Sequence, residues 1–306
     1  MSNSFNQRVF GCAIIKSINS NYNADFSHQP RTLPDGTAYA TDKVLKYSVR
    51  NYWDKVLGEK VFYFKSLSDT MSPRTLDETL EYHFGKEVLK AGDKNKVRLN
   101  VLKSILTCLD VRVFGGTYAG KTNLSLHGTT QITHGVNRYH ESVIYSEQIM
   151  SPFRNPGEKS GDSTQTTLGT QAKLQEGHYV HHFSVNPKNL KSDADRVENA
   201  GLTEDDIVKL KEGLRKGVSY YDSSAKAGTE NELLLWVQLK EGSKAVFPSF
   251  VELVTVGKDK KVDLQKVSNV LSKADNASEI EKIELYYNSD TTTVINEPAN
   301  SQFIEL

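Results

Sequence analysis

The sequence predicts an α+β protein whose centre is a ferredoxin-like core of the βαββαβ type. Two observations predict it. A β-branched apolar segment near the amino terminus precedes an amphipathic helix. A second clear helix lies in the C-terminal half, between two further strand candidates. The coarse order is therefore strand, helix, strands, helix, strand, with large insertions between these elements.

Size and composition fit a folded protein that needs no covalent staples. The 306 residues can bury a substantial core, as one elaborated domain or as two. Cys12 and Cys108 stand in apolar runs without metal-ligand spacing, so we expect buried free thiols. We find no signal-peptide pattern and no run near the ~18 apolar residues of a membrane span. We therefore expect a soluble, cytoplasmic protein.

Charge is balanced overall but unevenly distributed along the chain. Residues 1–125 hold 18 Lys and Arg against 12 Asp and Glu, a net charge of +6. Residues 126–306 hold 20 against 26, a net charge of −6. The amino-terminal part is therefore the better candidate for contact with an anionic partner. Opposite charges on the two parts also suit head-to-tail self-association.

The first element is a strand over 9–18, VFGCAIIKSI, which we expect to be buried on both faces. A polar loop over 19–40 follows, with a Pro-Asp-Gly turn. Thr41 or Asp42 can cap the next helix, and Gly58 can end it. The helical spacing places these residues on one face: Lys43, Lys46, Tyr47, Arg50 and Asp54. A polar loop before a cationic helix suits a phosphate backbone better than a hydrophobic ligand.

The middle of the chain mixes short strands with helices. We expect a short strand over 61–64 and one or two helices over 75–107, broken around Gly92-Asp93. Residues 110–118 are typical of a strand and a turn, and 124–146 of a hairpin. Residues 150–176 are rich in Gly, Ser, Thr and Gln, so they contribute little to a core.

The C-terminal half carries the second clear helix. The spacing predicts it over 203–216, with a Thr203/Asp206 capping box at its start and Gly217 at its end. Weaker patterns predict three more strands and one more helix. The strands lie over 178–185, 233–239 and 282–287, and the helix lies near 263–273.

Several motifs, in order, resemble the Cas7 family of CRISPR-associated proteins. No single motif is specific, but the ordered set spans residues 9 to about 240. The amino-terminal motifs are Asn21-Tyr22-Asn23-Ala24-Asp25, Pro30-Arg31, Gly36, Thr41-Asp42, Leu45-Lys46 and Arg50-Asn51-Tyr52. The later motifs are Asp110-Val111-Arg112-Val113-Phe114-Gly115, Gly128-Thr129-Thr130-Gln131, Thr167-Leu168-Gly169-Thr170, Gly177-His178-Tyr179, Val185-Asn186-Pro187 and Gly201-Leu202-Thr203-Glu204-Asp205-Asp206.

The resemblance implies one elaborated domain, 1–306, with an RNA-recognition-motif-like palm, helical fingers and an extended β-hairpin thumb. The palm would comprise 1–59, 109–145 and 177–306. The fingers would comprise 60–108, together with the 19–40 loop, and the thumb 146–176.

The family's role is to form the guide-RNA-binding backbone of CRISPR Cascade complexes in antiviral defence. The resemblance implies that this chain is such a subunit in a type I ribonucleoprotein, with I-B the best-fitting branch. Its partners would be the guide crRNA, further copies of itself, other Cascade subunits and, through the guide, target DNA. Such proteins hold RNA by its backbone, so pairing with the guide reads the sequence. No cofactor, metal or membrane is implied, and no catalysis.

The same resemblance implies the RNA-binding residues, although a solvated helix face or an ordinary turn would also explain most of them. Lysine offers a point charge and arginine a fork for phosphate oxygens, while glycine lets backbone N–H groups come close to RNA. The candidates are Asn21, Asn23, Arg31, Lys43, Lys46, Arg50, Gln131, Gly169, Thr170 and Lys173. The family often has Asn-Pro-Asn-Gly in the first loop, where this chain has Tyr22 and Ala24. That loop would have to be rebuilt if it needed a positive φ at glycine.

Two other functions remain open. A metal-independent endoribonuclease of the same superfamily could use imidazoles as general acid and base, and His178, Tyr179, His181 and His182 form such a cluster in sequence. These residues alternate along a strand, which favours a structural role. Asp25 is a further catalytic candidate, but a loop aspartate is more often a turn former. His134 and His140 lack zinc-site spacing. The other alternative is a protein-interaction scaffold without RNA affinity.

Overall fold

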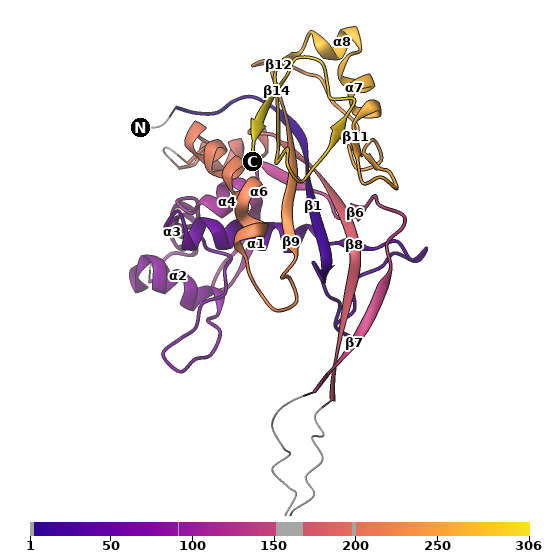
Figure 1. Cartoon of the computed structure of the whole chain (residues 1–306). Coiled ribbons are helices and arrows are strands. Elements are labelled where there is room, and N and C mark those ends of the chain that lie inside the picture. The colour runs from indigo at the N-terminus through magenta and orange to yellow at the C-terminus, as the bar shows by residue number, and fades with distance from the viewer. Residues whose placement is uncertain (1–2, 91, 151–167, 198–199) are drawn as a thin grey trace, which may run out of the picture.

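Helices and one large sheet form a mixed fold, confirming the α+β class (Figure 1). The structure is a computed structural model that describes residues 3–90, 92–150, 168–197 and 200–306. The helices are α1 (Asp42–Lys55), α2 (Leu76–Phe84), the 3-10 helix η1 (Lys86–Leu89), α3 (Lys94–Ile105), α4 (Leu109–Phe114), α5 (Lys188–Ala194), α6 (Glu204–Tyr220), α7 (Gln265–Leu271) and α8 (Ala274–Ala277). The strands are β1 (Val9–Ser20), β2 (Tyr39–Ala40), β3 (Gly115–Ala119), β4 (Asn123–His127), β5 (Thr130–Ile132), β6 (Gly135–Asn137), β7 (Ile144–Met150), β8 (Leu168–Val185), β9 (Thr229–Leu239), β10 (Thr255–Val256), β11 (Val262–Asp263), β12 (Ile280–Tyr287), β13 (Val294–Ile295) and β14 (Ser301–Glu305).

A nine-stranded, mostly antiparallel sheet carries the fold. Seven strands follow in the order β14-β12-β9-β1-β8-β6-β2, and β5 and β7 also pair with β8. β1 is antiparallel to both of its neighbours, with Val9 opposite Val185 of β8 and Gln238 of β9. The strand predicted over 9–18 is therefore the central one, and its burial on both faces is confirmed.

The two faces of the sheet are covered by different parts of the chain. On one face, Ala13 and Ile15 of β1 pack in a core with α1 and α6. On the other, Ile14 packs with Phe250 and neighbouring residues of the C-terminal segment that carries α7 and α8 (Figure 1). β1 is apolar along most of its length because both faces need it.

The helix predicted over 203–216 is present and longer than expected. Thr203 and Asp206 form the expected capping box. Gly217 does not end the helix, which continues to Tyr220. A Cβ at Gly217 would lie 3.0 Å from the backbone oxygen of Ser48 in α1. The glycine therefore permits the close approach of α6 to α1, a contact that local sequence does not reveal.

A third core lies in the lobe formed by residues 60–127. Most of its buried residues come from α2, η1, α3, α4, β3 and β4, and Leu190 of α5 and Ala200 join them from further along the chain. The break predicted around Gly92-Asp93 is confirmed, because Asp93 caps α3 by accepting from the Asn95 N–H at 3.1 Å. Cys12 and Cys108 are buried free thiols, as expected.

Two expectations in and beside this lobe were wrong, and one buried carboxylate joins the two segments concerned. Residues 61–64 are not a strand, because the backbone N–H groups of Phe62 and Tyr63 donate to Asp110 at 2.8 and 2.9 Å. The chain expected to be a strand from 110 instead forms α4, and β3 begins only at Gly115. The fully buried Asp110 carboxylate therefore accepts the two backbone N–H groups that a neighbouring strand would otherwise accept.

The segment 124–146 does not fold back on itself as the expected hairpin. β4 pairs with β3, while β5, β6 and β7 all pair with the long strand β8. Alternation identified extended chain here, but it carries no information on which strand is the partner. β7 and β8 form a long antiparallel hairpin, and part of the expected thumb, 151–167, lies outside the described residues. None of the helices in the described part of the chain could span a lipid bilayer.

Candidate nucleic-acid interface

The loop between β1 and α1 is built from two tight turns. In the first, Asp25 Oδ1 accepts from the N–H groups of Ser27 and Gln29 at 2.8 and 2.9 Å. In the second, the Leu33 N–H donates to Thr37 O at 2.8 Å, and Gly36 adopts φ 87°. The carboxylate of Asp25 is thus occupied by the backbone of its own turn, as expected of a turn former.

Asn21 and Asn23 hold this loop in place. The Asn21 side chain is buried, and its Nδ2 donates to His28 O at 3.2 Å and to Ala172 O of β8 at 3.4 Å. Asn23 Oδ1 accepts from both the N–H and the hydroxyl of Thr41, at 2.9 and 3.0 Å. The two asparagines therefore connect the loop to the base of the β7–β8 hairpin and to the start of α1.

Tyr22 and Ala24, the two positions that depart from the family pattern, differ in this structure. Tyr22 is fully buried, with its hydroxyl 3.4 Å from His181 Nε2 and its ring 5.3 Å from that of Tyr179. Ala24 does not take a positive φ. The left-handed backbone falls instead on Asn19 (φ 48°) and His28 (φ 62°). The loop of this chain therefore packs around a buried aromatic ring and needs no positive φ at residue 24.

Arg31 follows the first turn. Its N–H donates to Asn23 O at 3.3 Å, and its carbonyl accepts from the Tyr39 N–H at 2.9 Å. The side chain makes no ion pair with any described residue, and its buried Nε has no hydrogen-bond acceptor among them. The backbone is therefore fixed, while the guanidinium has no anionic partner among the described residues.

The three cations on one face of α1 differ in their ion-pair partners. Lys43 is exposed and has no ion-pair partner among the described residues. Lys46 pairs with Asp42 at 2.9 Å. Arg50 donates from Nε to buried Asp110 at 3.1 Å, and its guanidinium lies 5.1 Å from the Phe114 ring centroid. Helical spacing placed these residues together, but only Lys43 has an uncommitted charge.

The candidate RNA-binding residues on the sheet lie on two strands, β5 and β8. Gln131 of β5 is exposed, and its Nε2 donates to Gly128 O at 2.9 Å. Gly169 and Thr170 are exposed on β8, opposite Ile149 and Gln148 of β7. Lys173 lies further along β8 and pairs with Glu147 at 3.0 Å.

The structure thus brings part of the expected set together at one end of the sheet. Asn23 contacts the backbone of Arg31 and the start of α1 near Lys43, and Asn21 reaches the strand that carries Lys173. The 21–41 loop and the base of the hairpin meet there (Figure 1). Arg50 instead faces the 60–127 lobe through its ion pair.

Sequence reasoning missed Lys226, which lies in the loop between α6 and β9. Its ammonium donates to Tyr22 O and lies 5.4 Å from the Tyr22 ring centroid. Burial lowers the pKa of Lys226 to about 8. A lysine in a Ser-, Ala- and Gly-rich loop carries no sequence signal, because only the fold places it beneath residue 22.

The histidines of β8 are buried. His178 donates from Nδ1 to the Glu232 carboxylate at 2.7 Å, and its Nε2 is 3.5 Å from Glu176. His181 Nδ1 lies 3.0 Å from Thr133 O, and His182 Nδ1 accepts from the Phe250 N–H at 3.2 Å. Burial lowers the pKa values of His181 and His182 to about 4. These imidazoles serve internal hydrogen bonds.

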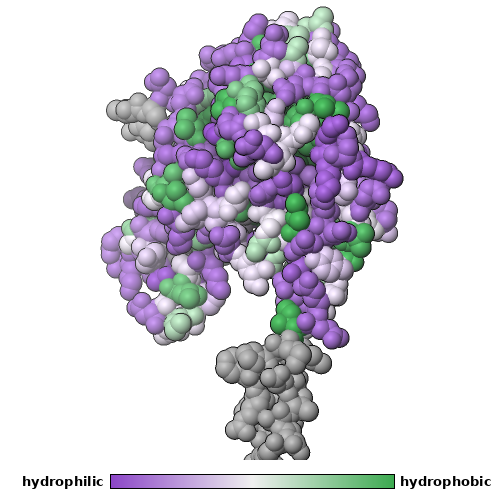
Figure 2. Space-filling view, viewed as in Figure 1, coloured by the Kyte–Doolittle hydropathy of each residue, from purple (hydrophilic) through white to green (hydrophobic). Residues whose placement is uncertain are grey.

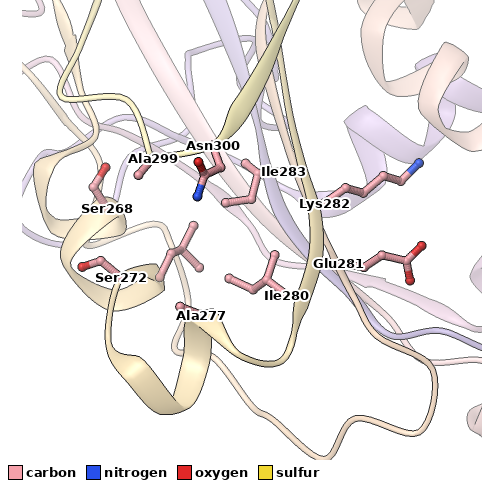
Figure 3. A pocket seen from close by; sticks show the side chains of 10 residues that line it. Ser268, Ser272, Ala277, Ile280, Glu281, Lys282, Ile283, Ala299 and Asn300 are labelled. Carbon is pink, nitrogen blue, oxygen red and sulfur yellow. The ribbon is translucent and has the colours of Figure 1, made fainter.

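A hollow of about 360 Å³ lies between α7, α8 and β12 (Figure 3). Ser268, Ser272 and Ile280 border it, whereas the charged ends of Glu281 and Lys282 point away from it (Figure 3). The hollow therefore offers no acid–base pair. The face shown in Figure 2 is mostly hydrophilic, with its apolar residues scattered over the surface.

Comparisons with known proteins agree with the fold. The family model of CRISPR-associated protein Cas7 matches residues 7–285. A chain of a CRISPR RNA-guided surveillance complex, described as pre-nicking, superposes with a TM-score of 0.60 at 13% identity, covering 98% of this chain and 96% of its own. A chain of another CRISPR RNA-guided surveillance complex gives a TM-score of 0.53 at 15% identity, covering 95% of each chain. No curated protein sequence matches.

Proposed function

We propose that this chain, which belongs to the Cas7 family of CRISPR-associated proteins, is a guide-RNA-binding backbone subunit of a Cascade complex. Several copies would line up along one crRNA with the other Cascade subunits, and the guide would pair with target DNA in antiviral defence. The chains with the same fold come from CRISPR RNA-guided surveillance complexes, which supports this role.

The proposal extends to the parts of the domain. The strand order β9-β1-β8-β6, with α1 and α6 on one face, suits an RNA-recognition-like palm over 1–59, 109–145 and 177–306. Residues 60–108 would be the fingers, and the β7–β8 hairpin would belong to a thumb over 146–176. Type I-B is the branch that the sequence motifs favour.

One observation carries the proposal most directly. The 21–41 loop, the start of α1 and the base of the β7–β8 hairpin are joined at one place by Asn21 and Asn23. At that place Arg31 and Lys43 have no anionic partner among the described residues. A fixed backbone that presents uncommitted cations suits the phosphates of a single strand.

The proposed role is non-catalytic. A general acid or base must come within hydrogen-bond reach of the reacting atoms. His178, His181 and His182 are 1%, 0% and 9% exposed, which keeps them from an RNA strand on the surface. The carboxylate of Asp25 is held by its own turn. These positions favour binding over cleavage.

Salt-dependent RNA binding tests the proposal. Fluorescence anisotropy would follow two labelled single-stranded RNAs of unrelated sequence, with wild type and an Arg31→Ala/Lys43→Ala variant. We expect similar affinities for both RNAs. Two lost phosphate contacts should flatten the slope of log K against log salt by about 1.4, from ~0.7 for each contact.

The matched control is Lys216→Ala/Lys240→Ala, which removes the same charge elsewhere. Lys216 pairs with Glu212 on α6, and Lys240 is exposed at the end of β9. The control should retain the wild-type slope. If wild type binds neither RNA, or if both double variants flatten the slope equally, the proposed interface is wrong.

A further inference from the structure

Lys226 is a cation with an unusual environment. It lies in the 221–228 loop, which meets the 19–31 loop at the end of the sheet. The Asn21 N–H donates to Ala225 O at 2.7 Å, and the Ile18 N–H donates to Gly228 O at 2.8 Å. The backbones of the two loops are therefore hydrogen-bonded on both sides of Lys226.

The surroundings of the ammonium are neutral. Lys226 Nζ donates to Tyr22 O and lies near the face of the Tyr22 ring, 5.4 Å from its centroid. No carboxylate among the described residues pairs with it, and the nearby Glu230 pairs with Lys16 at 2.7 Å. Burial lowers the pKa of Lys226 to about 8, so the chain retains this charge against a desolvation cost.

A cation retained at such a cost needs a reason other than stability. An apolar side chain of similar shape is often as stable as a buried charged one. The group that Lys226 holds is the peptide carbonyl immediately before Asn23. Asn23 in turn receives both hydrogen bonds from Thr41 and one from the Arg31 N–H.

We propose that Lys226 is a positioning residue for nucleic acid, which fixes the Tyr22–Asn23 peptide and so holds Arg31 and Lys43 in the geometry that receives the phosphates of single-stranded RNA. This inference rests on the proposed RNA-binding function. The ammonium acts from beneath the loop through the peptide carbonyl, and the phosphates are contacted by the residues that it positions.

Three variants test it. Lys226→Met keeps the length and apolar stem of the side chain and removes the charge. Lys226→Arg keeps a cationic donor. Lys216→Met, on α6, removes an exposed cation that pairs with Glu212. Each protein would be titrated with a labelled single-stranded RNA over a series of salt concentrations, after its melting temperature has been compared with that of wild type.

We expect Lys226→Met to bind RNA roughly tenfold more weakly, the loss of about one charge-assisted hydrogen bond, with an unchanged salt slope. Lys226→Arg should restore most of the affinity, and Lys216→Met should match wild type. A further fall in slope of ~0.7 when Lys226→Met is added to the Arg31→Ala/Lys43→Ala variant would show direct phosphate contact and overturn the positioning role. Wild-type affinity in Lys226→Met alone would overturn it as well.

Amide hydrogen exchange gives a second measurement that needs no RNA. In Lys226→Met, the amides of 21–31 should exchange faster than in wild type, while those of β1 and α6 remain protected. Unchanged exchange in 21–31 would contradict the inference. If wild-type protein fails to bind RNA, the proposed function fails, and this measurement still decides whether Lys226 orders the loop.

Discussion

The ion pair between Arg50 and Asp110 allows a decisive test of what the α1 cations do. Arg50 stands on the same helix face as Lys43 and was a candidate RNA contact for that reason. In the structure its Nε donates to Asp110, whose carboxylate also accepts from the N–H groups of Phe62 and Tyr63. The perturbation is Arg50→Met, compared with Lys43→Met.

The structure gives the expected magnitude. The Asp110 side chain is fully buried and that of Arg50 is 14% exposed. Removing one partner of a buried pair leaves an uncompensated charge and costs about 3–5 kcal/mol. Two backbone N–H donors remain to Asp110, so we expect about 3 kcal/mol for Arg50→Met, the low end of that range. Exposed Lys43 has no such role, and Lys43→Met should change stability by less than about 0.5 kcal/mol.

Urea unfolding of wild type, Arg50→Met, Asp110→Asn and the double variant forms a thermodynamic cycle. Because Asp110→Asn removes the charge that Arg50 compensates, the double variant should lose less than the sum of the single losses, by about 1–3 kcal/mol. RNA titration of the same proteins would give their salt slopes. We expect Lys43→Met to flatten the slope by ~0.7 and Arg50→Met to leave it unchanged.

Two results would refute this reasoning. Additive losses in the cycle would mean that the ion pair contributes nothing beyond its separate members. A flatter salt slope in folded Arg50→Met, at full stability, would show that the guanidinium binds phosphate instead of supporting the lobe of residues 60–127.

Three further predictions concern pH, helix packing and catalysis. Burial lowers the pKa values of His181 and His182 to about 4. As the pH falls below 6.5, these two histidines therefore take up protons in the unfolded chain before they do so in the folded protein. The free energy of unfolding should therefore fall between pH 6.5 and 4, by up to about 2 kcal/mol for each histidine at pH 5. Urea unfolding at a series of pH values would measure this loss, which should be smaller in His182→Gln. Gly217→Ala places a Cβ 3.0 Å from the Ser48 backbone oxygen of α1, so the clash should outweigh the gain in helix propensity and lower the melting temperature, whereas Gly201→Ala, with open space around its Cβ, should leave it unchanged. Asp25→Asn should leave RNA cleavage by the assembled complex unchanged at saturating RNA, and a hundredfold loss of rate there would make this chain an enzyme.

The sequence determined the elements whose signals are local. The apolar, β-branched run over 9–18 predicted a strand covered on both sides, and it is the central strand of the sheet. The period of the 203–216 helix and its capping box depend on residues three or four positions apart, so both were predictable. The ordered motifs were sufficient to identify the family, because order along the chain needs no geometry.

Tertiary structure decided the elements whose signals are not local. The β-branched run after Asp110 is helical in the fold, and the Asp110 carboxylate accepts from the N–H groups of Phe62 and Tyr63, almost 50 residues earlier. Arg50 donates to the same carboxylate, whereas Lys43 has no ion-pair partner among the described residues. The helical period predicted both residues on one face but could not predict this difference.

The candidate interface shows the same division. Sequence placed Asn21, Asn23 and Arg31 in one loop, but it could not place Lys226 beneath that loop, about 200 residues further along the chain. Periodicity and capping are set by neighbours in sequence, so a chain displays them directly. The partner of a buried charge is set by the packing of distant segments, and only the folded structure brings those segments together.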